Sequence, residues 1–131
     1  MNLIGRMRFL LVIAFLPLAS CEPAPIHLAI REAGPTLVAE AYKTWWFGLR
    51  SSEVPCVHDV TLVRQSDGKT LWKMTVAPER QCNHVRAFTI GEAPAGFRDE
   101  TKLASKLTPG DYMLNAWGIG EGTQHFTLPL G

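Results

Sequence analysis

Two short pairs of cysteine and histidine are the side chains of this sequence best suited to chemistry. Cys56-Val57-His58 and Cys82-Asn83-His84 share one spacing, in which a single residue separates the thiol from the imidazole. Residues i and i+2 of a β-strand point to the same side, so each pair could present a sulfur and a nitrogen together. Two thiolates and two imidazoles make a tetrahedral zinc set or a soft copper site, whereas two thiols in an oxidising compartment form a disulfide.

The first twenty residues indicate that the chain is exported. Arg6 and Arg8 precede an uncharged apolar run from Phe9 to Ala19. A membrane-spanning helix needs about 20 such residues, so this run is too short to span a bilayer and is typical of the helix of a cleaved signal peptide. The chain then divides into a signal peptide at 1–20, a tether at 21–25 and a folded domain at 26–131.

The segment that ends the apolar run, Leu18-Ala19-Ser20-Cys21, resembles the lipobox of bacterial lipoprotein precursors. The resemblance implies that the signal is cut before Cys21 and that this residue carries acyl chains such as palmitate. Several acyl chains anchor a protein stably, whereas a single chain binds a membrane only marginally. Glu22 stands where lipoproteins kept in the inner membrane of enteric bacteria have Asp, so the resemblance favours the outer membrane, with the domain facing the periplasm.

Three consecutive aromatic residues, Trp45-Trp46-Phe47, open a β-prone stretch that extends to about Arg50. Strand alternation would direct Trp45 and Phe47 into the core and leave Trp46 outside. Trp46 is therefore the candidate for an exposed aromatic residue that stacks on a sugar or a peptide.

Strand patterns dominate the folded domain. Residues 36–42 fit either a helix or a strand, and 97–106 are polar without a clear pattern. Several short strands with turn signals between them predict an all-β fold, a small antiparallel sandwich that follows the signal helix. Alternating or β-branched residues predict the strands at 26–31, 60–65, 70–76, 85–90, 112–117 and 123–130.

Asp67-Gly68 is the clearest hairpin signal in the chain, because a type I′ turn needs positive φ at both of its central residues. This register places Val63, Trp72 and Met74 together on the core face. If Asp67 and Gly68 form the turn, the facing pairs are Arg64 with Leu71, Val63 with Trp72 and Thr61 with Met74.

Export favours a disulfide as the role of the two remaining cysteines. The hairpin register puts Cys56 opposite Glu79, three residues before Cys82, so both cysteines would lie near the open end of the hairpin. Closing this loop would stabilise the fold by about 3 kcal/mol. A metal site made by Cys56, His58, Cys82 and His84 is the alternative. The other histidines, His27 and His125, show no ligand spacing and are expected at the surface.

Charge and missing motifs narrow the function. The chain from Cys21 onward keeps all 12 Asp and Glu and loses only Arg6 and Arg8 from the 13 Lys and Arg, so its net charge is −1. A nearly neutral, mixed surface argues against nucleic acid as a partner. The sequence has no motif of a serine hydrolase, a zinc protease, a P-loop or a dinucleotide site. The carboxylates Asp59 and Asp99-Glu100 show no partner, and we expect neither an enzyme nor a cofactor.

The stretch Leu107-Thr108-Pro109-Gly110-Asp111-Tyr112 resembles the entry to a late strand in immunoglobulin-like and fibronectin-type-III-like domains. The resemblance implies an immunoglobulin-like sandwich in which the Tyr112 hydroxyl hydrogen-bonds back to the backbone of the preceding turn. The sequence departs from true immunoglobulin domains in that Cys56 and Cys82 are too close together to be their inter-sheet bridge.

These features predict a lipid-anchored protein of the cell envelope with a non-catalytic binding or structural role. Its partners would be the membrane, through the lipid on Cys21, and another envelope protein or a glycan. The alternative is a periplasmic metal-handling lipoprotein that uses Cys56, His58, Cys82 and His84.

Overall fold

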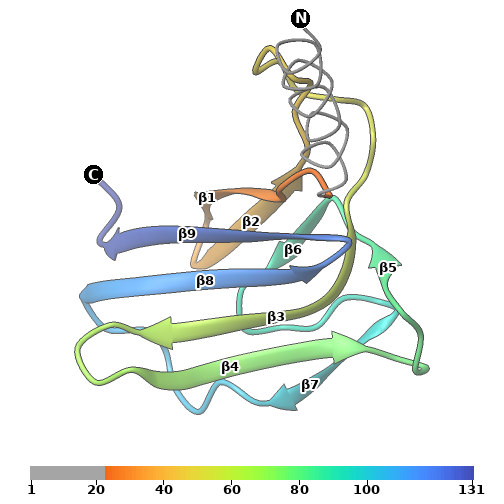
Figure 1. Cartoon of the computed structure of the whole chain (residues 1–131). Coiled ribbons are helices and arrows are strands. Elements are labelled where there is room, and N and C mark those ends of the chain that lie inside the picture. The colour runs from red at the N-terminus through yellow and green to blue at the C-terminus, as the bar shows by residue number, and fades with distance from the viewer. Residues whose placement is uncertain (1–22) are drawn as a thin grey trace, which may run out of the picture.

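The computed structural model describes residues 23–131, so the predicted signal peptide and Cys21 lie outside the described residues. The described part consists of β-strands joined by turns and loops, without a helix (Figure 1). In chain order the strands are β1 His27–Ala33, β2 Thr36–Tyr42, β3 Cys56–Arg64, β4 Lys69–Val76, β5 Asn83–His84, β6 Ala87–Thr89, β7 Phe97–Thr101, β8 Gly110–Gly118 and β9 Gly120–Leu128.

The strands form two antiparallel sheets that pack on each other. The smaller sheet has the order β1-β2-β6. The larger sheet has six strands in the order β7-β4-β3-β8-β9, with β5 paired to the start of β3. Each sheet has one apolar face, and burying both faces against each other gives the sandwich. The predicted all-β antiparallel sandwich is therefore confirmed.

One apolar core fills the space between the sheets. Strand alternation directs Leu62, Trp72 and Leu114 of the larger sheet inward, and all three are fully buried. Ala39 and Phe88 of the smaller sheet belong to the same core, and the rings of Trp72 and Phe88 lie 6.1 Å apart. Burying a large apolar side chain contributes about 1.5–3 kcal/mol, so this core is the main source of stability.

The strand β8 has the inward face that its sequence predicts. Tyr112, Leu114 and Ala116 alternate along it and are all buried. The Tyr112 hydroxyl donates a hydrogen bond to the carbonyl oxygen of Thr108, at 2.5 Å. This bond confirms the back-bond to the preceding turn, and it ties that turn to the first inward side chain of the strand.

The ambiguous segment 36–42 is the strand β2. It pairs with β1 on one side, where Ala39 faces Ile30 and Ala41 faces Leu28. On its other side it pairs with β6, where Ala39 faces Phe88. A central strand of this kind satisfies its backbone groups on both edges, which resolves the choice between helix and strand in favour of the strand.

The predicted register of the β3–β4 hairpin is wrong. Arg64 pairs with Lys69, so four residues rather than two connect the strands. The backbone N–H of Gly68 donates to the carbonyl of Arg64, and the N–H of Lys69 donates to the Asp67 carboxylate. Gly68 has a φ of 69°, whereas Asp67 does not have the positive φ that a type I′ turn requires.

The shifted register changes which side chains of β3 enter the core. A bulge between Leu62 and Val63 lies just before the turn in the chain. On the side of the bulge away from the turn, Leu62 pairs with Trp72 and Val60 with Met74. Trp72 and Met74 are buried as predicted, but Leu62 rather than Val63 accompanies them. A change of register by one residue moves a strand's side chains to the opposite face, which explains the error.

The predicted strand 85–90 is a strand only at Ala87–Thr89, and a second short strand, β5, precedes it in the other sheet. Asn83–His84 forms β5 beside β3 of the larger sheet, and Ala87–Thr89 forms β6 beside β2 of the smaller one. Between them the N–H of Val85 donates to Pro55, and the carbonyl of Arg86 accepts from Ala41. The chain therefore crosses from one sheet to the other at Val85 and Arg86.

Candidate functional site

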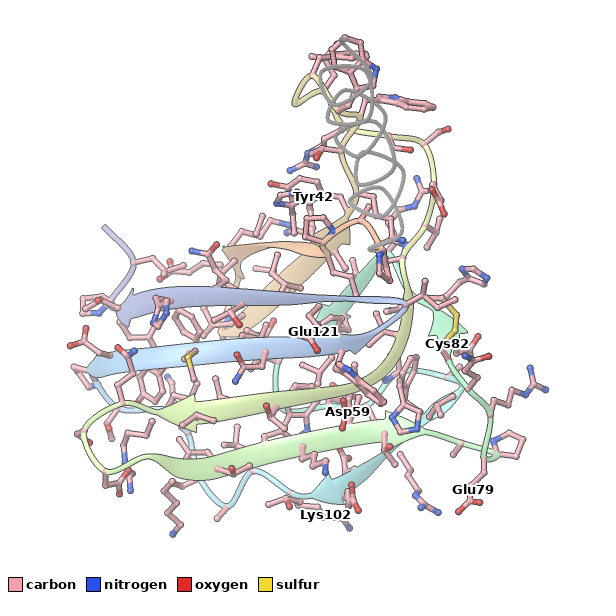
Figure 2. All side chains as sticks on the ribbon, in the orientation of Figure 1. Tyr42, Asp59, Glu79, Cys82, Lys102 and Glu121 are labelled. Atoms are coloured by element: carbon pink, nitrogen blue, oxygen red, sulfur yellow. A yellow bond between two sulfur atoms is a disulfide. The ribbon has the colours of Figure 1, made fainter. Side chains whose placement is uncertain are left out.

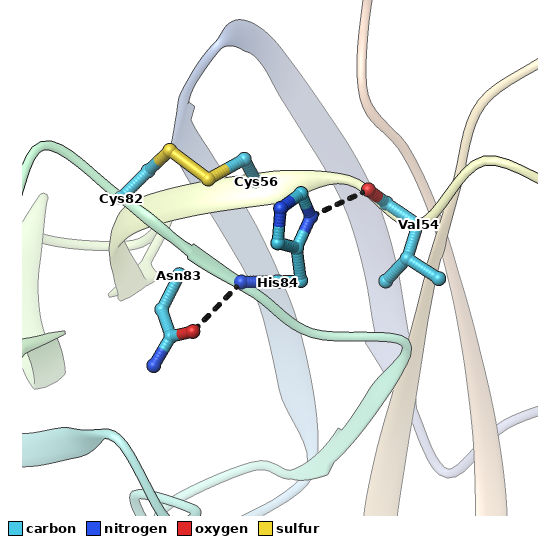
Figure 3. Close-up of a disulfide and its surroundings, with 5 residues drawn as sticks. All are labelled: Val54, Cys56, Cys82, Asn83 and His84. Atoms are coloured by element: carbon cyan, nitrogen blue, oxygen red, sulfur yellow. Dashed lines mark hydrogen bonds between the residues drawn. A yellow bond between two sulfur atoms is a disulfide. The ribbon is translucent and has the colours of Figure 1, made fainter.

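The predicted disulfide is present. It joins Cys56, the first residue of β3, to Cys82, the residue before β5, and their Cα atoms are 5.3 Å apart (Figure 3). The pairing of β5 with β3, in which Cys56 faces His84, brings the two cysteines together. The hairpin with β4 does not do so, because its paired residues end at Asp59 and Thr75.

The four residues of the alternative metal site are not brought together as ligands. Both sulfurs are bonded to each other, so neither is a thiolate. The Nδ1 of His84 hydrogen-bonds the carbonyl of Val54 at 3.1 Å (Figure 3). The ring of His58 packs edge-on against Trp117, with centroids 5.1 Å apart. Within residues 23–131 no group of three or more His, Cys, Asp or Glu side chains is arranged to hold a metal ion.

The most unusual surface feature is the segment between β2 and β3, which rises away from both sheets in Figure 1. We call residues Trp45–Leu49 the aromatic loop. Their exposed fractions are 52% for Trp45, 94% for Trp46, 53% for Phe47 and 64% for Leu49. The exposure of Trp46 agrees with the prediction, but the expected packing of Trp45 and Phe47 into the core is wrong. A folded domain rarely exposes several large apolar side chains side by side, so the aromatic loop is a candidate interaction surface.

Local turn geometry explains why these aromatic residues do not form a long strand. The N–H of Trp45 donates to the carbonyl of Leu49 at 2.7 Å, and the N–H of Gly48 donates to Trp45 at 2.9 Å. Gly48 has a φ of 86°, which only glycine adopts at low cost. The chain therefore reverses over residues 46–48, and a single bridge between Thr44 and Arg50 closes the loop.

A stack of side chains braces the base of the aromatic loop. The Tyr42 ring stacks on His27 with centroids 5.2 Å apart, and the Arg50 guanidinium lies 3.9 Å from the centre of the same ring. Figure 2 shows Tyr42 where the segment leaves the sheets. Thr44 hydrogen-bonds the His27 ring at 3.2 Å. His27 thus has a positioning role that its lack of ligand spacing did not reveal.

Ion pairs extend this brace onto the outer face of the smaller sheet. Glu40 pairs with Arg31 at 3.0 Å and with Arg50 at 3.5 Å. The hydrogen bond from Arg31, supported by Arg50, holds the pKa of Glu40 below its ordinary value of 4.5. These groups are solvent-exposed, so each pair contributes little to stability, and their main effect is to orient Arg50 beneath the loop.

The tether enters the domain at the end where the aromatic loop leaves it. The first residue of β1, His27, faces the last residue of β2, Tyr42. The N–H of Ile26, the residue after the tether, donates to the carbonyl of Glu121 at 2.9 Å, which holds residues 23–25 near the start of β9. The tether, the aromatic loop and the turn between β8 and β9 therefore share one end of the sandwich.

Glycine makes this close approach of backbones possible. A Cβ atom at Gly120 would overlap the carbonyl oxygen of Ala24, and one at Gly122 would overlap that of Ile26. A Cβ at Gly118 would likewise meet the carbonyl of Cys56. The glycine-rich connection is thus a packing surface for the tether and for the start of β3.

An apolar groove of about 480 Å³ lies at the opposite end of the sandwich. It opens beside the turn that joins β1 to β2, at the end of β2 remote from the aromatic loop. Glu32 and Lys106 stand among its lining residues. Its apolar walls include Pro35, Leu37, Ile90, Leu103, Leu107 and Leu128.

The carboxylates that had no partner in the sequence have structural ones. Asp99 accepts a hydrogen bond from the indole N–H of the buried Trp72 at 2.8 Å, and another from the backbone of Ala93 at 3.2 Å. Lys73 lies 3.8 Å from Asp59 and 3.4 Å from Glu100. These contacts account for the three carboxylates through pairing and support of the core.

Comparison with family models and curated proteins assigns the chain to no family. The chain matches no known family model, and the curated proteins yield no significant match. Among residues 23–131 there is no helix with the length and hydropathy needed to cross a bilayer.

Proposed function

We propose that the protein is a lipid-anchored component of the cell envelope that acts as a non-catalytic binding module. The lipid on Cys21 would hold it in the membrane, with the outer membrane favoured by Glu22. The observation that carries the binding role is the aromatic loop, in which four large apolar side chains are exposed on a braced stem.

Physical chemistry supports a binding role for this loop. Burial of apolar surface stabilises a fold by about 25 cal/mol for every Å² removed from water. Side chains left exposed give up this stabilisation, and the folded domain gains nothing in return from their exposure. The stem formed by Tyr42, His27 and Arg50 limits the conformations that the loop can adopt. A pre-ordered apolar tip loses less entropy on binding than a flexible one.

The anchor is tested with the full chain expressed in a Gram-negative host. Intact mass and peptide mass of membrane-purified protein should show acyl chains on Cys21 and cleavage before it. Cys21→Ser should abolish the lipid mass and retain an uncleaved signal. A wild-type protein whose Cys21 is unmodified, or whose mature chain begins elsewhere, would refute the anchor. Hydrolytic turnover by purified wild-type protein, absent from a mock purification, would refute the non-catalytic role.

A further inference from the structure

We propose that the aromatic loop inserts into the interfacial region of the bilayer that holds the lipid on Cys21. The loop and the lipid would then form two contacts with one membrane, which fixes the orientation of the sandwich and turns the apolar groove away from the bilayer. This inference rests on the proposed lipid anchor and deepens it by naming the partner of the loop.

The side chains of the loop have the chemistry of the membrane interface. Trp45, Trp46, Phe47 and Leu49 combine large apolar surfaces with indole N–H groups that can remain near the headgroups. No acidic residue lies between Glu40 and Glu53. The cationic Arg50 sits at the base of the loop, with more than half of its side chain exposed. Arg31 and Arg50 share one carboxylate, Glu40, at the base, which leaves a net charge of +1 there. An apolar tip over a weakly cationic base suits a bilayer with anionic lipids.

The topology puts the loop and the lipid within reach of one surface. His27 and Tyr42 face each other and therefore lie at the same end of the smaller sheet. Cys21 is six residues before His27, a separation of at most about 20 Å in an extended chain. Trp46 is four residues beyond Tyr42, at most about 14 Å away. An anchor at Cys21 therefore holds the domain close enough for the tip of the loop to touch the bilayer.

The shape of the loop favours a bilayer over a protein or a glycan. A stable protein interface takes about 20–30 residues from each side, whereas this loop offers five. A sugar site needs polar groups that fix hydroxyls, and the side chains of 45–49 offer only the two indole N–H groups. Hydrocarbon accepts an apolar tip without any matching shape.

The experiment uses lipidated full-length protein purified from membranes and reconstituted into phosphatidylethanolamine–phosphatidylglycerol vesicles with brominated acyl chains. Bromine near the interface should quench part of the tryptophan fluorescence of the wild-type protein. The variant Trp45→Ala/Trp46→Ala should lose this quenching. Trp117→Ala is the comparison variant, because Trp117 is 50% exposed beside the tether but lies outside the loop. It should keep the larger part of the quenching, which the two loop tryptophans provide.

The outcomes separate the loop from the anchor. Unquenched wild-type protein that remains vesicle-bound and carries the Cys21 lipid would overturn the insertion and leave the anchor intact. Protection of the loop tryptophans by added peptidoglycan fragments in place of quenching would overturn it in favour of a glycan. Absence of lipid on Cys21 would refute the anchor, and the inference with it. Circular dichroism of each variant should match the wild type, because the replaced side chains are exposed.

Discussion

The rings of His27 and Tyr42 stack across β1 and β2, with centroids 5.2 Å apart and planes inclined by 20°. This pair links the residue where the tether enters the fold to the residue where the aromatic loop leaves it. Arg50 closes over the same tyrosine ring. One tyrosine thus connects the start of β1, the end of β2 and the base of the exposed loop.

Replacing this ring should loosen the loop and lower stability. Tyr42→Ala removes both the stacking on His27 and the cation–π contact with Arg50, and we expect the free energy of unfolding to fall by about 1–2 kcal/mol. Tyr42→Phe keeps the ring and should remain within about 0.5 kcal/mol of the wild type. Urea unfolding compares the variants. Equal losses in both would show that the hydroxyl, and not the ring, matters.

Removing the disulfide should destabilise the domain without changing its fold. We expect Cys56→Ser/Cys82→Ser to lower the free energy of unfolding by about 3 kcal/mol, because the unfolded chain regains the entropy of the open loop. Urea unfolding of the wild type with and without reductant gives an independent measurement. The reduced wild type should match the double variant, and unchanged stability on reduction would contradict the prediction.

A methyl group at Gly122 should disturb the docking of the tether. The Cβ of Gly122→Ala would overlap the carbonyl of Ile26, and overpacking of this kind costs about 1–3 kcal/mol. Gly34→Ala is the control, since no atom lies within 4 Å of its Cβ position and its φ of 60° confines the strain to the turn between β1 and β2. Hydrogen exchange at the Ile26 amide should accelerate in Gly122→Ala and not in Gly34→Ala. Equal protection in both variants would argue against the contact.

The β3–β4 turn should show a small dependence on acid. Hydrogen bonds from Arg64 and from the backbone of Lys69 lower the pKa of Asp67 from 3.8 to about 2. Because the pKa is lowered in the folded protein, the ionised Asp67 stabilises the fold above about pH 4. This stabilisation is lost as the pH falls through 2. Carbon-detected NMR titration should give this pKa, and Arg64→Met should raise it towards 3.8. An Asp67 that titrates near 3.8 in both proteins would contradict the pairing.

Several features could be read from local sequence because they depend on neighbours along the chain. Alternation places Tyr112, Leu114 and Ala116 on one face whatever the partner strand is. The turn before β8 positions the Tyr112 hydroxyl within its own segment. The disulfide was predicted from the two cysteines that remain once Cys21 is assigned to the lipid and from the predicted export of the chain, although the strand that brings Cys82 to Cys56 was not foreseen.

Only the tertiary structure decided the features that depend on distant segments. The bulge at Leu62 and Val63 is set where β3 pairs with β4. The crossing at Val85 and Arg86 exists because the partner strands β3 and β2 belong to different sheets. Sequence alternation predicted a core position for Trp45, whereas the reversal at Gly48 turns it towards solvent.

The sequence alone determined the period of the strands, the resemblance to a lipobox and the available cysteines, because each depends on a few adjacent residues. The tertiary structure decided strand register, sheet membership and the exposure of the aromatic loop. Register and exposure depend on backbone hydrogen bonds and burial between segments that are far apart in the chain, and no local pattern encodes which of several similar pairings has the lowest free energy.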